Sequence, residues 1–297
     1  MTTTEVIPEL VQFGPSTPTA HDPSHDAPEL VIRPRSGWIP IDWRELWAFR
    51  ELLYFLVWRD VKVRYKQTVL GVAWAVLQPV FGMVVFTIIF GNFAKIPSDG
   101  MPYAVFVYAG LLPWTFFANG VSQGGQSLVN QQHLLTKVYF PRLFVPAASL
   151  GVALVDLGFS FAVLGGIMAW YHVAPAWGVL WLPVLVLLTA VASLGVALAL
   201  AALTVSYRDF RFIIPFMMQA WMYLSPVVYP VTMVPRKYQW ALAINPMAGI
   251  IDAYRSAILG KPWNLTTLGV STLAALALFG FGLFYFRTTE RRFADIA

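Results

Sequence analysis

Long apolar runs, each nearly free of charged residues, limit how this chain can fold more than any other feature. A helix needs roughly 20 consecutive apolar residues to cross the hydrocarbon core of a bilayer. Trp and Tyr often stand near the ends of these runs, as is typical of a membrane interface. The sequence therefore predicts an all-α integral membrane protein. Its six predicted transmembrane helices cover residues 69–93, 103–128, 143–170, 177–205, 212–229 and 265–286.

The composition fits burial in lipid rather than in a soluble core. Hydrophobic residues make up 58% of the chain and charged residues 12%, whereas soluble domains carry about 25% charged residues. The lack of cysteine excludes disulfides, thiolate metal sites and a cysteine nucleophile. The four histidines are scattered, so neither a metal site nor a catalytic pair is predicted. We assign the net charge of +5 to topology and lipid headgroups, and expect no nucleic acid as a partner.

The distribution of Lys and Arg predicts the orientation in the membrane. Fifteen of the 20 fall in the N-terminal region, in alternate connections and in the C-terminal tail, and five fall on the opposite side. Lys and Arg concentrate on the cytoplasmic side, so both termini are predicted to be cytoplasmic. Residues 1–37 contain several acidic residues and prolines and are predicted to form a disordered tail, followed by a transmembrane domain over residues 38–297.

An amphipathic helix is predicted ahead of the first span, over residues 42–58. Asp42 can cap this helix, and Glu45 three residues later completes a pair that resembles a capping box. A helix rich in Trp that ends in basic residues fits the surface of a membrane. The alternative is a helix packed on another subunit or on the spans.

The long connection before the last span is predicted to hold two short helices. The first covers residues 236–244, and the second begins at Asn245–Pro246, a cap followed by a favourable first-turn residue. Gly260 offers a stop. We interpret the pair as re-entrant helices that hold the basic residues of this connection near lipid headgroups. These residues are Arg236, Lys237, Arg255 and Lys261.

A cluster of cations directly before the first span is a candidate binding site. Such a collar at headgroup depth suits phosphate groups through charge-assisted hydrogen bonds. The alternative is a topology anchor without a ligand. The collar consists of Arg59, Lys62, Arg64 and Lys66.

Asp156 is an acidic residue in the middle of a predicted span. Placing a carboxylate there costs roughly 2.5–3.5 kcal/mol, so such a residue is a functional candidate. We weigh a proton relay or pore-lining role against a structural role with hydrogen bonds inside the bundle. No second acidic residue or lysine in another span stands out as its partner.

Aromatic residues are frequent in the predicted spans. Rings can stack on the faces of sugars, so an aromatic path would suit a glycan, although such residues are also ordinary lipid-facing ones. The candidates for a channel lining are Tyr108, Trp114, Phe117, Tyr223 and Tyr229.

Several motifs occur together and in order: RDVKVRYKQTVLGVAWAVLQP at 59–79, GLLPWTFF at 110–117, KVYFPR at 137–142, SPVVYP at 225–230 and NPMAGIIDAYR at 245–255. Together they resemble the membrane subunit of polysaccharide-exporting ABC transporters, the ABC type-2 permeases that export O-antigen and teichoic acid. The resemblance extends from about residue 38 to the C-terminus.

The resemblance implies a channel subunit in the inner membrane that works as a homodimer with a pair of separate ABC ATPase subunits. ATP and Mg would bind to those partners, since this chain has no GxxxxGK[ST] loop and is predicted to be no enzyme itself. The implied substrate is a glycan linked through pyrophosphate to a polyprenyl lipid, and the collar would contact the pyrophosphate. The residues implied in coupling to the ATPase are His133, Leu134, Leu135, Lys137, Tyr139, Arg208 and Asp209.

Two other functions remain open at the level of sequence. One is an ABC type-2 permease for small amphiphiles or drugs. The other is an ion-coupled transporter that uses Asp156, which the lack of a second ionisable group within the spans disfavours.

Overall fold

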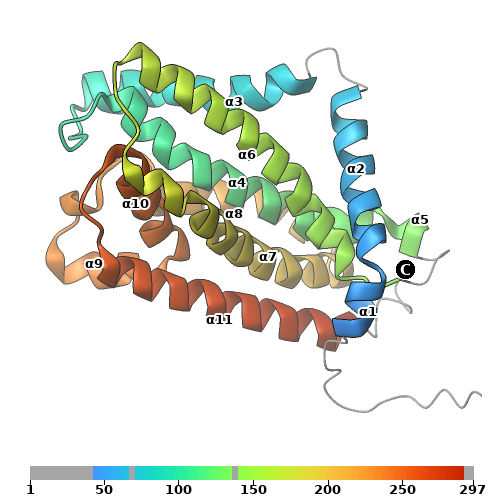
Figure 1. Cartoon of the computed structure of the whole chain (residues 1–297). Helices are drawn as coiled ribbons and strands as arrows, with labels where there is room; N and C mark the ends of the chain where they lie inside the picture. Colours follow the sequence, from blue (N-terminus) through green and yellow to red (C-terminus); the bar gives the residue numbers. More distant parts are fainter. Residues whose placement is uncertain (1–42, 67–70, 136–139, 291–297) are drawn as a thin grey trace, which may run out of the picture. The chain divides into compact units, whose positions relative to one another are not determined.

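The computed structural model describes residues 43–66, 71–135 and 140–290, and all regular secondary structure within these ranges is helical (Figure 1). The chain divides by its own contacts into Met1–Gly37 and Trp38–Ala297. The predicted tail and the predicted cap at Asp42 lie outside the described residues. All of the described helices belong to the second unit.

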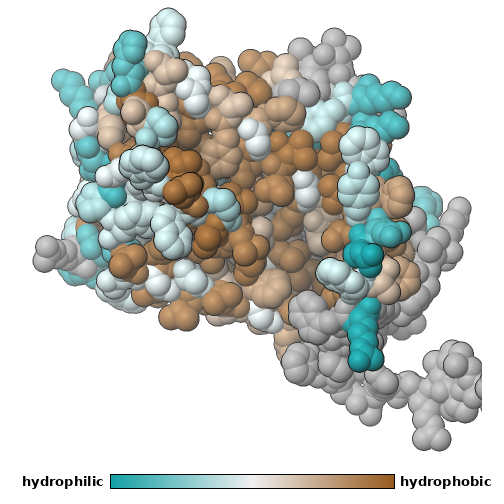
Figure 2. Space-filling model, viewed as in Figure 1, coloured by the Kyte–Doolittle hydropathy of each residue, from teal (hydrophilic) through white to brown (hydrophobic). Residues whose placement is uncertain are grey.

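Among the described residues of this unit, five helices are long and apolar enough to cross a membrane. The first combines the end of α3 (Gly71–Phe86) with the π-helix η2 (Thr87–Phe93). The others are α4 (Tyr103–Asn130), α6 (Phe144–Trp170), η3 (Trp177–Trp181) with α7 (Leu182–Ser206), and α11 (Leu265–Thr289). Hydrophobic side chains cover the middle of the face in Figure 2, and hydrophilic ones gather toward its sides. The chain is a multi-pass membrane protein.

The predicted span over residues 212–229 is shorter than expected. Its helix, α8, covers Phe210–Leu224, which is 15 residues. At 1.5 Å per residue α8 reaches only about 22 Å, less than the roughly 30 Å of a hydrocarbon core. The helix ends because Pro226 restricts the residue before it, and Ser225 is extended with φ −101° and ψ 147°.

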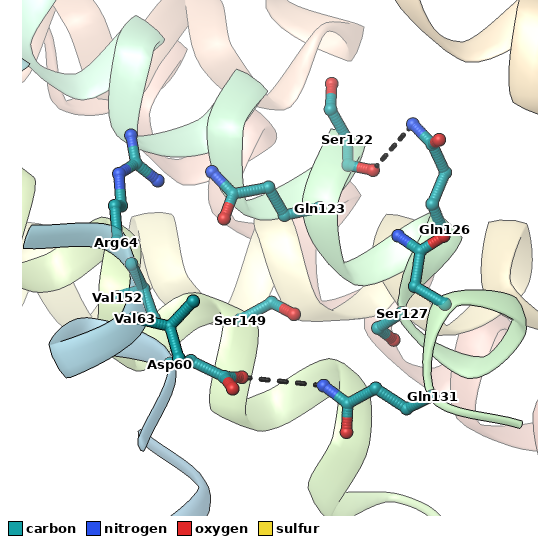
Figure 3. Close-up of a pocket in the computed structure, with 11 residues that line it drawn as sticks. Asp60, Val63, Arg64, Ser122, Gln123, Gln126, Ser127, Gln131, Ser149 and Val152 are labelled. Carbon is teal, nitrogen blue, oxygen red and sulfur yellow. Dashed lines mark hydrogen bonds between the residues drawn. The ribbon is translucent and has the colours of Figure 1, made fainter. Parts of the chain in front are cut away.

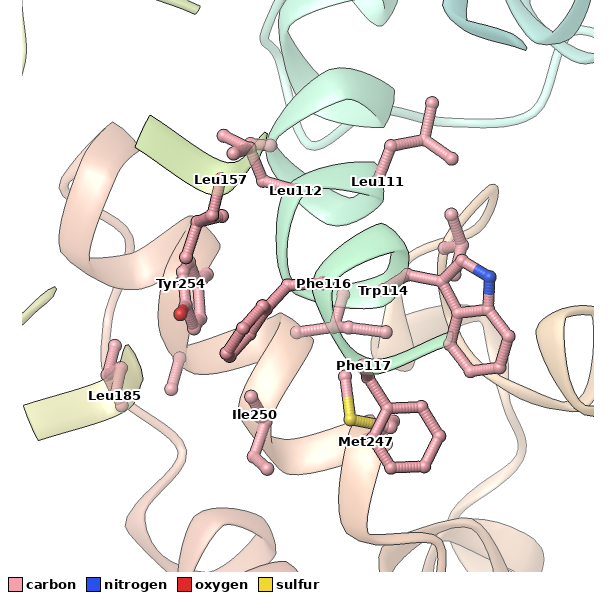
Figure 4. Close-up of a cluster of buried hydrophobic side chains, with 14 of the residues drawn as sticks. Leu111, Leu112, Trp114, Phe116, Phe117, Leu157, Leu185, Met247, Ile250 and Tyr254 are labelled. Carbon is pink, nitrogen blue, oxygen red and sulfur yellow. The ribbon is translucent and has the colours of Figure 1, made fainter. Parts of the chain in front are cut away.

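The helix α4 forms the centre of the bundle. In its most apolar 18-residue stretch 83% of the residues are buried, compared with 6% in Val76–Phe93. Small residues let α7 pack closely against it. A Cβ atom on Gly124 would lie 2.8 Å from the Cβ of Ala197, and one on Gly120 would lie 2.4 Å from the Ser193 hydroxyl. Most large apolar side chains around α4 belong to one buried cluster (Figure 4).

The segment of the predicted interface helix, residues 42–58, differs in its bounds from what the structure shows. The observed helices are α1 (Trp43–Ala48) and α2 (Arg50–Lys66), so helical structure continues through the whole cationic collar. On α2, Leu56 is buried and Val57 packs against Gly151 of α6, whereas Trp58 is exposed. One side of α2 therefore packs on the spans, and another presents aromatic rings outward.

Two helices before α11 confirm that this connection holds two short helices. They are α9 (Arg236–Ile244) and α10 (Pro246–Leu259). The Asn245 side chain accepts a hydrogen bond of 3.0 Å from the backbone N–H of Met247, and Gly260 ends α10 with a left-handed φ of 72°. Such a φ favours glycine because it has no Cβ. The apolar side of α10 is buried against α4, α7 and α11.

Candidate functional site

The helix α4 carries a polar stripe although it lies at the centre of an apolar bundle. Its members recur three or four residues apart, so they share one side of the helix. They are partly or well exposed, whereas most of their neighbours along α4 are buried. The stripe consists of Thr115, Asn119, Ser122, Gln123, Gln126 and Asn130.

The part of the stripe from Ser122 to Asn130 forms one wall of a groove between α4, α2 and α6, with a volume of about 540 Å³. The groove lies toward the end of the bundle that holds α5 (Gln132–Leu135). From α2, Asp60 and Arg64 line it, and Arg64 and Gln123 point toward each other across it (Figure 3). Its lining is thus mainly hydroxyl and amide groups with one guanidinium and one carboxylate.

Asp156 of α6 meets α2 beside this groove, through Arg64. Its Oδ2 lies 2.8 Å from Nη2 of Arg64, and its Oδ1 accepts a hydrogen bond from the Tyr65 hydroxyl. Only 9% of the Asp156 side chain is exposed, compared with 32% for Arg64. Burial, and then the hydrogen bond to Asp156, raises the pKa of Tyr65, so that its hydroxyl stays a donor. Two adjacent residues of α2 therefore hold both oxygens of the buried carboxylate.

A second, smaller cavity of about 20 Å³ lies beside this contact. It is lined by Asp156 and Ser160 of α6, by Thr115 and Asn119 of α4, and by Arg64. Arg64 therefore borders both cavities, and the polar stripe of α4 continues from one to the other.

The four residues of the predicted collar are not equivalent. Arg59, Lys62 and Lys66 are exposed and recur at intervals of three and four along α2, so they share one side of that helix. Arg64 lies on another side, in the groove. Asp60, also in the groove, contacts Arg59 at 2.7 Å and Gln131 at 3.5 Å. Only one of the four cations thus faces the polar cavity.

The predicted channel aromatics also separate into groups. Tyr108, Trp114 and Phe117 are at most 4% exposed and pack in the core of the chain, where Figure 4 shows Trp114 and Phe117. Tyr229 is half-buried and packs on the edge of the core, while Tyr223 on α8 is 53% exposed. Burial assigns the first three to helix packing within this chain rather than to an open path.

The predicted coupling segments lie at one end of the bundle. The short helix α5 contains His133, Leu134 and Leu135, and the turn before α8 contains Arg208 and Asp209, both exposed. A contact of 3.5 Å between Arg211 and Asn130 joins that turn to the end of α4. Lys137 and Tyr139 lie outside the described residues.

Arg255 corrects the prediction that the basic residues of its connection lie near headgroups. It is 1% exposed, and its guanidinium donates to the carbonyls of Phe106, Pro226, Val227 and Tyr229 at 3.2, 2.7, 2.6 and 3.4 Å. It also lies 3.7 Å from the centre of the Phe106 ring. Arg255 thus fixes the non-helical turn after α8 to α4, and its role is structural.

Sequence reasoning missed two parts of this site. The stripe on α4 was detectable, because amides and hydroxyls at intervals of three and four in an apolar run define one side of a helix. The contact of Asp156 with Arg64 and Tyr65 was not, because it joins residues about 90 positions apart.

These features define a helical membrane protein with a polar groove inside an apolar bundle. The profile of the ABC-2 type transporter family matches residues 51–259, well over half of the 297 residues. The chain belongs to that family.

Relatives within the family carry names from polysaccharide export. The chain is 31% identical over 215 residues to the O-antigen export system permease protein RfbA of Myxococcus xanthus, covering 72% of this chain and 82% of that protein. It is 25% identical over 247 residues to RfbA of Klebsiella pneumoniae, covering 83% and 95%. It is 22% identical over 250 residues to the polysialic acid transport protein KpsM of Escherichia coli, covering 78% and 91%.

Proposed function

We propose that this chain is the membrane subunit of an ATP-driven exporter that moves a polysaccharide, linked by pyrophosphate to a polyprenyl lipid, from the cytoplasm across the inner membrane. The observation that carries the proposal is the polar groove bordered by Arg64 in a member of the ABC-2 family. Hydroxyl and amide groups suit the hydroxyls of sugars, and a guanidinium suits the oxygens of a phosphate. The relatives named for O-antigen and polysialic acid export support a glycan as cargo.

The orientation follows from the charges. Most of the described Lys and Arg residues lie on α1 and α2 or at the end of the bundle that holds α5. This end is cytoplasmic in our proposal, with both termini on that side. The groove would then face the compartment in which a lipid-linked glycan is made.

The energy source is proposed to be a separate ATPase. The sequence has no phosphate-binding loop of the GxxxxGK[ST] type, so ATP and Mg would bind to a partner subunit. That partner would contact α5 and the turn at Arg208 and Asp209, which lie at the same end of the bundle. The functional unit is a homodimer of this chain with a pair of ATPase subunits.

Within the groove, Arg64 is the proposed contact for the pyrophosphate. The exposed side of α2 that carries Arg59, Lys62 and Lys66 is proposed to meet lipid headgroups instead. Aromatic rings exposed on the same helix, including Trp58, fit the interfacial region of a membrane.

A chromosomal replacement tests the proposed function. Deleting the gene should remove surface polysaccharide, and the wild-type chain should restore it. An Arg64→Gln variant should restore about 10- to 100-fold less, because a charge-assisted hydrogen bond contributes about 1.5–3 kcal/mol. Arg50→Gln is the matched control, since Arg50 lies on α2 but outside the groove and donates to the carbonyl of Trp47. Immunoblots of membranes must give equal amounts of both variants.

The deletion strain also tests which cargo is exported. Intact surface polysaccharide in the deletion strain would reject glycan export and favour a permease for small amphiphiles.

Purification of the tagged chain in mild detergent tests whether an ATPase partner is present. An ATPase should copurify in an amount equal to that of the tagged chain. Its absence, repeated in a second detergent, would reject the proposed energy source.

A further inference from the structure

Arg64 borders the large groove while it contacts Asp156 at 2.8 Å. We propose that Asp156 and Tyr65 form a latch that holds Arg64 and α2 against α6, and that an anionic group entering the groove takes Arg64 from Asp156. The release of Arg64 then lets α2 move away from α6. This inference rests on the proposed function, because it assigns Asp156 and Tyr65 as positioning residues for the phosphate contact.

The latch consists of two contacts on one carboxylate. Arg64 lies at Oδ2 and Tyr65 donates to Oδ1, so the end of α2 is joined to α6 on both sides of the carboxyl group. The Arg64 contact is an ion pair without the alignment of a hydrogen bond, since Oδ2 accepts none among the described residues. Such a pair can exchange for a ligand with better geometry.

A phosphate is a stronger partner for Arg64 than Asp156 is. The guanidinium has five N–H donors in a planar fork, and a diphosphate offers more oxygens and more negative charge than one carboxylate. At 32% exposed, the Arg64 side chain can be reached from the groove. Asp60, the other charged group lining the groove, is held by Arg59 and Gln131. The incoming anion therefore competes with Asp156 for Arg64.

Opening of the latch would also separate α2 and α6 about two turns away. There, Val57 packs against Gly151, and a Cβ on Gly151 would lie 3.3 Å from the Cβ of Val57. This distance is close to the roughly 3.5–4.5 Å between Cβ atoms in a disulfide. Since the chain has no cysteine of its own, the pair Val57→Cys and Gly151→Cys reports on this contact alone.

The test measures the rate of disulfide formation between these cysteines in the full-length chain, in membrane fragments open to both faces. Inorganic pyrophosphate should slow the reaction roughly tenfold, which corresponds to a difference of about 1.4 kcal/mol in its affinity for the two positions of α2. Sodium chloride at equal ionic strength should not. Adding Arg64→Gln should abolish the response to pyrophosphate. Adding Asp156→Asn should slow the reaction even without pyrophosphate, because the latch is then weakened.

Each other outcome counts against the latch. An unchanged rate with pyrophosphate would overturn it, as would equal slowing by chloride or in the Arg64→Gln background. Failure of the cysteine pair to react at all would contradict the α2–α6 contact on which it depends. The export assay is separate: a normal response to pyrophosphate with no loss of surface glycan on gene deletion would retain the latch and reject the cargo.

Discussion

Replacing Arg255 by Met should destabilise this protein severely without touching the groove. The substitution keeps an unbranched side chain but removes every donor to the carbonyls of Phe106, Pro226, Val227 and Tyr229. Three of these hydrogen bonds are 3.2 Å or shorter. Hydrogen bonds to charged groups contribute about 1.5–3 kcal/mol each, and the variant no longer has to desolvate a guanidinium. The expected net loss is about 3–5 kcal/mol.

This effect is measured by heating the detergent-solubilised chain. The midpoint is the temperature at which half of its monodisperse peak in size-exclusion chromatography is lost. Each kcal/mol shifts the midpoint by roughly 2–4 °C in proteins of this size, so the midpoint should fall by about 6–20 °C. Lys237→Met is the control, since Lys237 is exposed, and it should change the midpoint by no more than about 2 °C. If the Arg255 variant unfolded like this control, the guanidinium would not hold the turn after α8, and the structural role assigned to it would be wrong.

The other predictions concern helix packing and coupling. Gly195→Ala should destabilise the bundle by about 1–3 kcal/mol, because the new Cβ would lie 2.5 Å from the Cα of Phe279 on α11. Gly158→Ala should instead be stabilising by about 0.5–1 kcal/mol, since a Cβ there meets nothing within 4 Å. The same heating assay compares the two, and equal effects would contradict the close approach of α7 and α11. Truncating Leu134 and Leu135 to Ala should reduce copurification of the ATPase or export. Leu180→Ala, at a 77% exposed position on η3, should leave both at wild-type levels.

Most of the helical architecture was predictable from the sequence because its signals are local. An apolar run of about 20 residues has few alternatives to a membrane span, and five of the six predicted runs form helices of sufficient length and hydropathy. The bounds of α9 and α10 followed from Asn245, Pro246 and Gly260, which act on the backbone around them. The helix predicted over residues 212–229 is shorter than expected for a local reason too, since Pro226 ends α8 early.

Side chains with similar sequence signals have different surroundings, and it takes the packed bundle to distinguish them. Arg64 and Lys66 stand two residues apart on α2, yet Arg64 lies in the groove and Lys66 is exposed. Tyr108 and Tyr223 are both aromatic residues in apolar segments, yet one is fully buried and the other is 53% exposed. The helical period fixes which residues share a side, but not which neighbour that side meets.

Local patterns along the chain establish that it spans a membrane, where most of its helices lie, and which family motifs it carries. Helix packing, in contrast, sets which polar groups meet inside it. The buried Asp156 has partners because α2 lies against α6, and Arg255 is internal because α10 packs beside the non-helical turn after α8. Inside an apolar bundle a charge is stable only beside its partners, and those partners lie far away in the sequence, where no local pattern reveals them.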